Sequence, residues 1–193
     1  MTTLGITGGI GSGKSAAAAR LNTHPGVRVV YADAVAKRLM VEDPAVQDAV
    51  RQRFGTDAYR EDGTLDRGTL ASRVFGSPDE LAALNAIVHP AVRRAMLAAL
   101  EEARASGVRL LVYEAALVFE TGADAWLDHV AVVDAPGAVR IERAAARDGS
   151  STEAVRARMD RQMDPAEMRD RADTVHVLHS GLLTGSHASG VRR

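Results

Sequence analysis

One stretch near the amino terminus constrains this chain more than any other. Residues 8–15 read Gly-Gly-Ile-Gly-Ser-Gly-Lys-Ser, which fits the spacing G-x-x-x-x-G-K-[ST] of a phosphate-binding loop. Thr3–Thr7 before it predicts a short buried strand, and Ala16–Leu21 after it predicts a helix. Together, the loop amides and the helix amino terminus favour an anion. The pattern therefore indicates a nucleoside triphosphate site, and a glycine-rich turn that only caps a helix is the alternative.

The residue types in this loop suit triphosphate chemistry. Glycines admit positive φ and leave no Cβ between the backbone and a phosphate. Lys14 can reach the β- and γ-phosphates, and the Ser15 hydroxyl can ligate Mg²⁺. Lys14 is one of only two lysines, the other being Lys37, in a chain with 24 basic residues. The predicted ATP- and phosphate-binding residues of the loop are Gly8, Gly9, Ile10, Gly11, Ser12, Gly13, Lys14, Ser15 and Ala16.

Composition excludes several other classes of protein. A net charge of −1 over 193 residues gives no general attraction to nucleic acid or to anionic membranes. The chain has no cysteine, so disulfides, thiolate metal sites and a thiol nucleophile are excluded. No apolar run approaches the length of a membrane span. We expect a cytoplasmic monomer or weak homo-oligomer that binds small molecules and neither nucleic acid nor membranes.

Asp33 stands directly after a predicted strand. Val27–Tyr31 is β-branched and bounded by Pro25-Gly26, which is typical of a strand. In a doubly wound sheet, a carboxylate past the carboxyl end of a strand lies on the ligand-binding edge. There Asp33 could act as a general base or bind Mg²⁺ indirectly, and equally it could cap the helix expected over Ala34–Met40. Position alone leaves both hypotheses open.

Residues 44–107 predict helices and no strand. The expected helices are Ala45–Phe54, Thr69–Phe75, Pro78–Ile87 and Ala91–Ala105, with turn signals between them. This run is longer than a single crossover, so we interpret residues 34–106 as an inserted helical domain for an acceptor substrate.

Glu114 ends the clearest buried strand, Val108–Tyr113. Beside a phosphate loop, an acidic residue at a strand tip usually holds Mg²⁺ through water, although Asp is commoner there. Simple solvation at a strand end is the alternative.

Arginines gather in two predicted helices near the carboxyl terminus. After a strand at Val130–Asp134, the helix Ala138–Arg147 places Arg140, Arg143 and Arg147 on one face. A second helix over Thr152–Met163 carries Arg156, Arg158 and Arg161. An exposed ion pair could explain any single arginine, whereas the cluster predicts a lid that closes over a triphosphate.

These elements predict an α/β fold of the P-loop NTPase class, a doubly wound parallel five-stranded sheet with helices on both faces. The last strand is expected at Thr174–Leu178. The predicted nucleotide-binding core comprises residues 1–33, 107–145 and 172–181, the lid residues 146–171, and a frayed tail residues 182–193.

Several stretches in order resemble the dephospho-CoA kinase family, over nearly the full length to about Gly181. They are Leu4–Ser15, Ala32-Asp33-Ala34, Phe54-Gly55 with Asp62–Arg67, Leu84–Pro90, Leu117–Glu120, and Arg143 with Arg147-Asp148 before Gln162. Lys37 and Ala115-Ala116 depart from the family pattern, as does Leu178–Gly181, where the family has an Asn-rich turn.

The resemblance implies that MgATP phosphorylates the ribose 3′-hydroxyl of dephospho-CoA, in the last step of coenzyme A biosynthesis. It implies that Asp33 is the base, and that Lys14, Arg143, Arg147 and Mg²⁺ on Ser15 share the γ-phosphoryl charge. Arg67, His89, Pro90 and Glu114, with Asp33, would bind the acceptor, and Glu114 could also hold Mg²⁺ through water.

Two other activities share parts of this pattern. A nucleotide or nucleoside kinase would use the same loop and lid with a different acceptor. A GTPase-like switch would need an Asn/Thr-Lys-x-Asp element, which the sequence around Lys37 does not supply. A scaffold protein would not need the loop, Asp33 and the arginines together.

Overall fold

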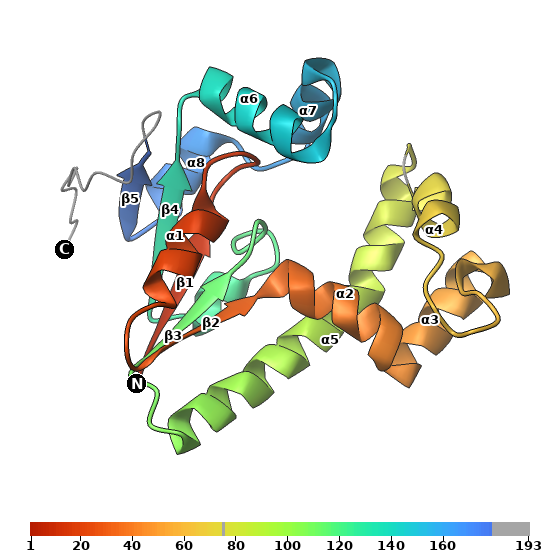
Figure 1. Cartoon of the computed structure of the whole chain (residues 1–193), viewed down its shortest axis with the longest axis horizontal. Helices are drawn as coiled ribbons and strands as arrows, with labels where there is room; N and C mark the ends of the chain where they lie inside the picture. Colours follow the sequence, from red (N-terminus) through yellow and green to blue (C-terminus); the bar gives the residue numbers. More distant parts are fainter. Residues whose placement is uncertain (75, 179–193) are drawn as a thin grey trace. The chain divides into compact units, whose positions relative to one another are not determined.

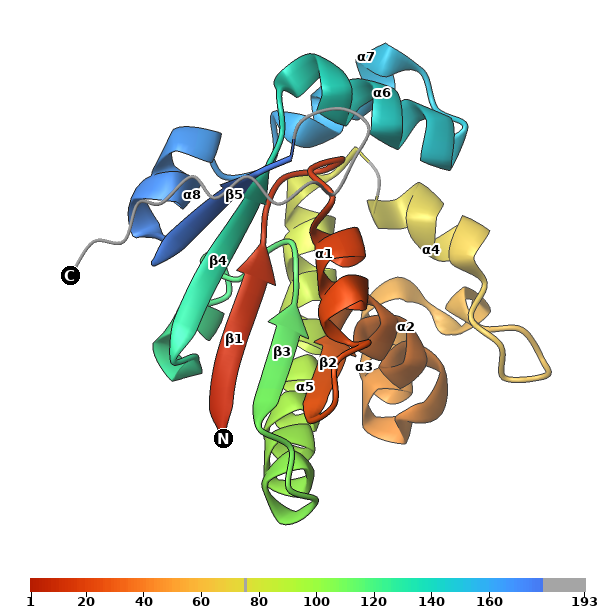
Figure 2. The same cartoon turned by 60° about the vertical axis from the view of Figure 1, so that its left-hand side comes forward.

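The computed structural model describes residues 1–74 and 76–178, and these contain one five-stranded sheet. The strand order is β2-β3-β1-β4-β5, as Figure 2 shows. The strands are β1 (Thr2–Thr7), β2 (Val27–Tyr31), β3 (Leu110–Glu114), β4 (His129–Asp134) and β5 (Thr174–Val177), which Figure 1 labels. β1 pairs in parallel with both β3 and β4, and β4 pairs in parallel with β5. The predicted parallel α/β sheet is confirmed.

The middle of β3 and of β4 is apolar. Leu111 and Val112 in β3 have no exposed surface, and Val132 in β4 is also buried. Parallel strands are covered on both faces, so they read as continuous apolar runs without alternation. At the amino-terminal end of β1, the Thr3 backbone N–H and hydroxyl both donate to the Asp128 carboxylate, at 2.7 and 2.9 Å.

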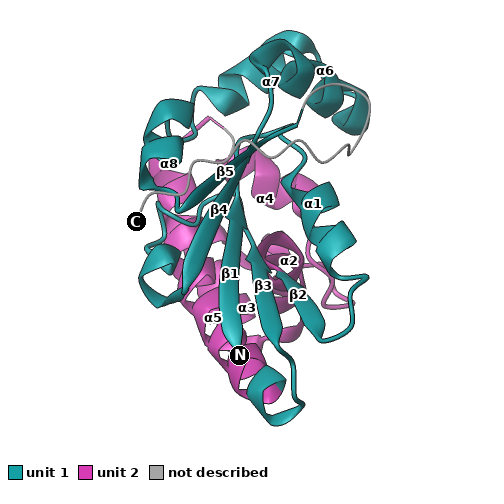
Figure 3. Cartoon of the chain, turned by 90° about the vertical axis from the view of Figure 1, so that its left-hand side faces the viewer, with its two compact units in different colours: residues 1–30, 103–193 teal, residues 31–102 magenta. Residues whose placement is uncertain are grey.

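The chain divides into two compact units, coloured in Figure 3. The first unit is Met1–Val30 with Ala103–Arg193, and the second unit is Tyr31–Glu102. The boundaries expected from the sequence remain a prediction. The expected tail, residues 182–193, lies outside the described residues.

The helices of the first unit are α1 (Lys14–Leu21), α6 (Gly137–Asp148), α7 (Thr152–Met159) and α8 (Pro165–Arg171), with a short 3₁₀ turn η2 (Ala123–Trp126). α1 lies against β1, β3 and β4, α6 against α7, and α8 against β4. The helix expected over Thr152–Met163 is too long, because α7 ends at Met159. The sequence analysis missed the separate helix α8, although Asp164 caps it and Pro165 begins it, a common helix start.

Among the described residues of the second unit, the regular elements are helices, apart from Tyr31, which ends β2. Its elements are α2 (Ala32–Glu42), α3 (Pro44–Phe54), η1 (Thr56–Ala58), α4 (Arg67–Val74) and α5 (Pro78–Ala105), whose last three residues belong to the first unit. Val46, Val50 and Phe54 of α3 pack with Leu70 and Val74 of α4 in a buried apolar core.

α5 corrects one expectation. The sequence predicts two helices, Pro78–Ile87 and Ala91–Ala105, but the structure has one helix with Pro90 inside it. An internal proline removes one backbone hydrogen bond and costs a helix about 3 kcal/mol or more. Here Val88, Ala91 and Val92 on either side are buried, and their packing outweighs that cost.

No helix among the described residues has the length and apolar character that a bilayer-spanning segment requires. A cytoplasmic location and a monomeric or weakly oligomeric state stay predictions.

Candidate nucleotide-binding site

The loop between β1 and α1 has a backbone that only glycine adopts easily. Gly11 has φ 75° and Gly13 has φ 98°, and Gly13 is the left-handed residue directly before α1. Space is short as well, because a Cβ on Gly8 would overlap the Val133 carbonyl and one on Gly11 would overlap the Arg140 backbone. The loop is therefore pressed against the end of β4 and the first turn of α6.

A pocket of about 190 Å³ opens over this loop. Gly11, Gly13, Lys14, Ser15 and Ala16 line it from the loop and the start of α1. Arg143 and Arg147 of α6 line it from the other direction. All seven residues belong to the first unit, so the structure brings the predicted loop and two of the six clustered arginines to one pocket.

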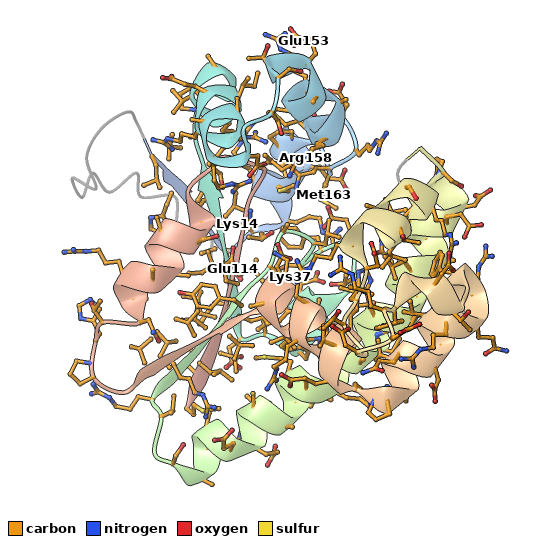
Figure 4. The ribbon with its side chains drawn as sticks, turned by 45° about the vertical axis from the view of Figure 1, so that its right-hand side comes forward. Lys14, Lys37, Glu114, Glu153, Arg158 and Met163 are labelled. Carbon is orange, nitrogen blue, oxygen red and sulfur yellow. The ribbon has the colours of Figure 1, made fainter. Side chains whose placement is uncertain are left out.

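Ser15 and Glu114 meet beside this pocket. The Ser15 hydroxyl donates to Oε1 of Glu114 at 3.0 Å, and Glu114 is buried at the end of β3. Figure 4 shows Glu114 and Lys14 close together where β3 ends and α1 begins. A hydroxyl and a carboxylate are the hard oxygen ligands that Mg²⁺ prefers, and Mg²⁺ in such sites keeps several waters and substrate phosphates. The pair therefore fits the predicted Mg²⁺ ion. The described residues hold no cluster of three or more His, Asp or Glu that could bind a metal by itself.

Asp148 joins the two arginine-bearing helices. Nε and Nη2 of Arg147 donate to its two carboxylate oxygens at 2.7 and 3.0 Å, and Nη1 of Arg158 donates at 2.7 Å. These hydrogen bonds, from Arg147 first and then from Arg158, hold the pKa of the Asp148 carboxyl far below its usual range. Arg147 thus reaches the pocket from the end of α6 with its guanidinium oriented by the next residue.

Arg140 does not join Arg143 and Arg147 in the pocket, contrary to the face predicted for the helix. It is buried, its Nε donates to the carbonyl oxygen of Ile10 at 3.1 Å, and its Nη1 lies 3.8 Å from Oδ1 of Asp134. Asp134 also accepts from Arg169 of α8 at 2.7 Å. Burial lowers the pKa of Arg140, and Asp134 opposes that shift. Arg140 therefore supports the loop from behind.

Gln162 contacts the loop at Ile10, and reasoning from the residues alone did not predict this contact. Its Oε1 accepts a hydrogen bond from the Ile10 backbone N–H at 2.8 Å, across 152 positions of sequence. Gln162 stands in the turn after α7, directly before Met163, which Figure 4 labels. Only the resemblance to the kinase family marked it, because no spacing rule links it to the loop.

The Ser12 side chain is not among those that line the pocket. It is fully buried, and its Oγ has no hydrogen-bond partner within the described part of the chain. Its backbone N–H donates to the Gly9 carbonyl at 3.1 Å. Ser12 therefore shapes the turn and contributes no hydroxyl to the pocket.

The other predicted acceptor residues, Asp33, Arg67, His89 and Pro90, belong to the second unit. α2 begins at Ala32 and its capping residue is Tyr31, so the hypothesis that Asp33 caps the helix is wrong. Asp33 is exposed in the first turn of α2, and Arg67 is exposed at the start of α4. Burial lowers the pKa of the half-buried His89 imidazole.

A family model described as dephospho-CoA kinase matches residues 2–182 of this chain. The chain belongs to the dephospho-CoA kinase family. It is 52% identical to the dephospho-CoA kinase of Salinibacter ruber over 180 residues, which cover 93% of this chain and 89% of that protein. It is 43% identical to the dephospho-CoA kinase of Corynebacterium diphtheriae over 175 residues, covering 91% and 87% of the two chains.

Solved structures agree with this family. The dephospho-CoA kinase of Campylobacter jejuni superposes with a TM-score of 0.66 at 26% identity, over 93% of this chain and 89% of that one. The protein TT1252 of Thermus thermophilus superposes with a TM-score of 0.76 at 38% identity, over 92% and 88%.

Proposed function

We propose that this chain transfers the γ-phosphoryl group of ATP to the ribose 3′-hydroxyl of dephospho-CoA, giving CoA and ADP. The observation that carries the proposal is the pocket lined by residues 11 and 13–16 of the loop together with Arg143 and Arg147. The acceptor is inferred from membership of the family, and the phosphate site is inferred from the pocket.

The chain's own residues suit the donor. Loop amides and the amino terminus of α1 bind the phosphate oxygens, and Lys14 contributes an ammonium to them. Arg143 and Arg147 stabilise the charge that spreads over the oxygens of the transferring group, an effect that is large in phosphoryl transfer. Ser15 and Glu114 would hold Mg²⁺, which supplies further neutralisation of the β- and γ-phosphates when bound.

Asp33 is proposed as the base on the family resemblance. In the transfer, the 3′-hydroxyl oxygen bonds to the γ-phosphorus, the bond from phosphorus to the bridging oxygen breaks, and ADP leaves. The hydroxyl proton passes to the Asp33 carboxylate. Arg67, His89 and Pro90 are proposed acceptor contacts. Glu114 was also predicted there, but its bond with Ser15 favours the magnesium side of the site.

The test is ADP release by the purified protein with MgATP, comparing dephospho-CoA with adenosine, AMP and no acceptor. We expect turnover with dephospho-CoA alone and a product phosphorylated on the 3′-oxygen. Turnover on AMP or adenosine instead would keep the loop and lid roles but discard the acceptor, and acceptor-independent GTP hydrolysis would favour a nucleotide switch.

Two variants of α1 sharpen this assay. Lys14→Ala removes the ammonium that lines the pocket, so ATP binding and turnover should fall together. Arg20→Ala is the matched control, because Arg20 is an exposed cation in the last turn of the same helix. Equal losses in both variants would contradict a specific role for Lys14.

A further inference from the structure

Ile10, at the tip of the loop, is held from both sides by side chains that come from outside the loop. Its backbone N–H donates to Gln162, at 2.8 Å, and its carbonyl accepts from Nε of Arg140, at 3.1 Å. Neither side chain is among those that line the pocket. Two successive peptide planes of the phosphate loop are therefore fixed by residues that need not touch the nucleotide.

The second of these peptide planes, between Ile10 and Gly11, could rotate into a reversed orientation. The Ser12 N–H donates to the Gly9 carbonyl at 3.1 Å, so residues 9–12 form a tight turn with Ile10 and Gly11 at its centre. Gly11 has φ 75°, the value that a type II turn requires at its third residue. Type I and type II turns differ mainly in the orientation of the central peptide, here the one between Ile10 and Gly11. Rotation of that peptide would reverse its N–H.

Arg140 sets the orientation of this peptide. The C=O of Ile10 and the N–H of Gly11 share one planar trans unit and point in opposite directions. Because the carbonyl is bonded to the Arg140 side chain, the Gly11 N–H points away from the Arg140 guanidinium. Gly11 lines the phosphate pocket and Arg140 does not, so that N–H is left available to a phosphate oxygen.

The guanidinium is itself well fixed. Arg140 is 5% exposed, lies 3.8 Å from Asp134, and shares that carboxylate with Arg169 of α8. The Arg140 backbone is bonded in the first turn of α6, with its N–H donating to the Pro136 carbonyl at 3.0 Å. A lysine at this position would keep the charge near Asp134 but would lack the Nε–H that reaches the loop.

From these contacts we infer that Arg140 and Gln162 are positioning residues for ATP: they lock the Ile10–Gly11 turn of the phosphate loop in the orientation that presents the Gly11 N–H to the phosphates. Gln162 also ties the turn after α7 to the loop, so the segment that follows the lid arginines is bound to the phosphate site. The inference rests on the proposed function only in that ATP is the ligand of this pocket.

The experiment compares Arg140→Lys and Gln162→Met with the wild type. ATP affinity is measured by calorimetry without any acceptor, and backbone hydrogen exchange is followed in the peptide that covers residues 8–13. We expect the ATP dissociation constant to rise about tenfold or more in Arg140→Lys and about fivefold in Gln162→Met, the usual effect of losing one charged or one neutral hydrogen bond. The loop amides should exchange faster in both.

Two further variants separate this role from general packing. Gln162→Glu keeps an acceptor for the Ile10 N–H, so the loop should stay protected from exchange even though the added negative charge weakens ATP binding. Gln52→Met is the control, since Gln52 is exposed on α3 in the second unit, and neither readout should change. If Arg140→Lys fails to fold, Gln162→Met and Gln162→Glu still carry the test.

The inference would be overturned if Gln162→Met showed unchanged hydrogen exchange in the loop and an ATP affinity within about twofold of the wild type. A twofold change in affinity corresponds to less free energy than one typical hydrogen bond contributes. A fall in kcat with unchanged KM for ATP would also overturn it, because loop positioning acts on ATP binding. A wild type that binds ATP but does not phosphorylate dephospho-CoA would refute the proposed acceptor and leave this inference standing.

Discussion

Replacing Gly11 by alanine tests the close approach between the phosphate loop and α6. At φ 75° an alanine pays the strain of the left-handed region, about 1–2 kcal/mol. The added Cβ would also overlap the Arg140 carbonyl, which is fixed in the first turn of α6. Relief requires the loop to move away, so the bond from Arg140 to Ile10 is lost, at a further cost of about 1–3 kcal/mol.

A matched glycine isolates the second cost. Gly122 has φ 67°, and no heavy atom of the described residues lies within 4 Å of a Cβ built on it, so Gly122→Ala has the backbone strain alone. Both glycines belong to the first unit. We therefore expect Gly11→Ala to be about 1–3 kcal/mol less stable than Gly122→Ala, and to bind ATP at least about tenfold more weakly.

Urea unfolding followed by Trp126 fluorescence measures the first quantity, and calorimetric titration with ATP measures the second. Trp126 is the only tryptophan and lies edge-on to Tyr113, with ring centres 5.1 Å apart, so its signal reports the first unit. If Gly11→Ala matched Gly122→Ala in both stability and ATP affinity, the loop would not be confined by α6 and the argument would be refuted.

Three other predictions follow from single side chains. Asp33→Asn should keep ATP binding yet lose turnover by about 100-fold or more, the usual scale for a general base, and near-normal turnover in a steady-state assay would remove that role. Ser15→Ala should raise the Mg²⁺ concentration needed for turnover. Ser12→Ala removes a buried hydroxyl that has no partner among the described residues, so it should be neutral or slightly stabilising in thermal melts. Equal effects of the two substitutions would contradict these assignments. The pKa of the Asp148 carboxyl is lower in the folded chain than in the unfolded chain, where it is about 4. The ionised carboxylate therefore stabilises the fold at pH values above about 4. That stabilisation is lost as the pH falls through the folded value, so urea midpoints measured from neutral to acidic pH should fall more steeply for the wild type than for Asp148→Asn, and parallel curves would count against the pairing with Arg147.

Local sequence patterns predicted most of the sheet, the phosphate-binding loop and Glu114. The loop is defined by adjacent residues, and Glu114 is marked by the apolar strand that it ends, so both could be found in sequence. The structure then places Glu114 on the hydroxyl of Ser15 and places Arg143 and Arg147 over the loop. Strand ends in a parallel sheet meet at one edge, which is why position in sequence was enough.

What the sequence could not predict depends on tertiary burial. Helical spacing assigned Arg140 to the same face as Arg143, but spacing does not say that its guanidinium is buried behind Ile10. The contact of Gln162 with Ile10 joins distant segments and has no local signal. Pro90 predicted a helix boundary because propensity favours one, and the buried neighbours that keep α5 continuous are visible only in the fold.

The division of the chain has a consequence for the order in which it folds. β1 pairs with β3 in a register that sets Thr2 opposite Leu110. The centre of the sheet therefore forms only when two segments that are far apart in the sequence come together. The entropy lost in closing such a loop grows with its length. Residues 31–102 have an apolar core of their own, and folding them first would shorten the flexible connection and lower the closure cost by about 1 kcal/mol. Substitutions in that core, far in sequence from any phosphate-binding residue, would then slow the assembly of the nucleotide site without altering its final geometry.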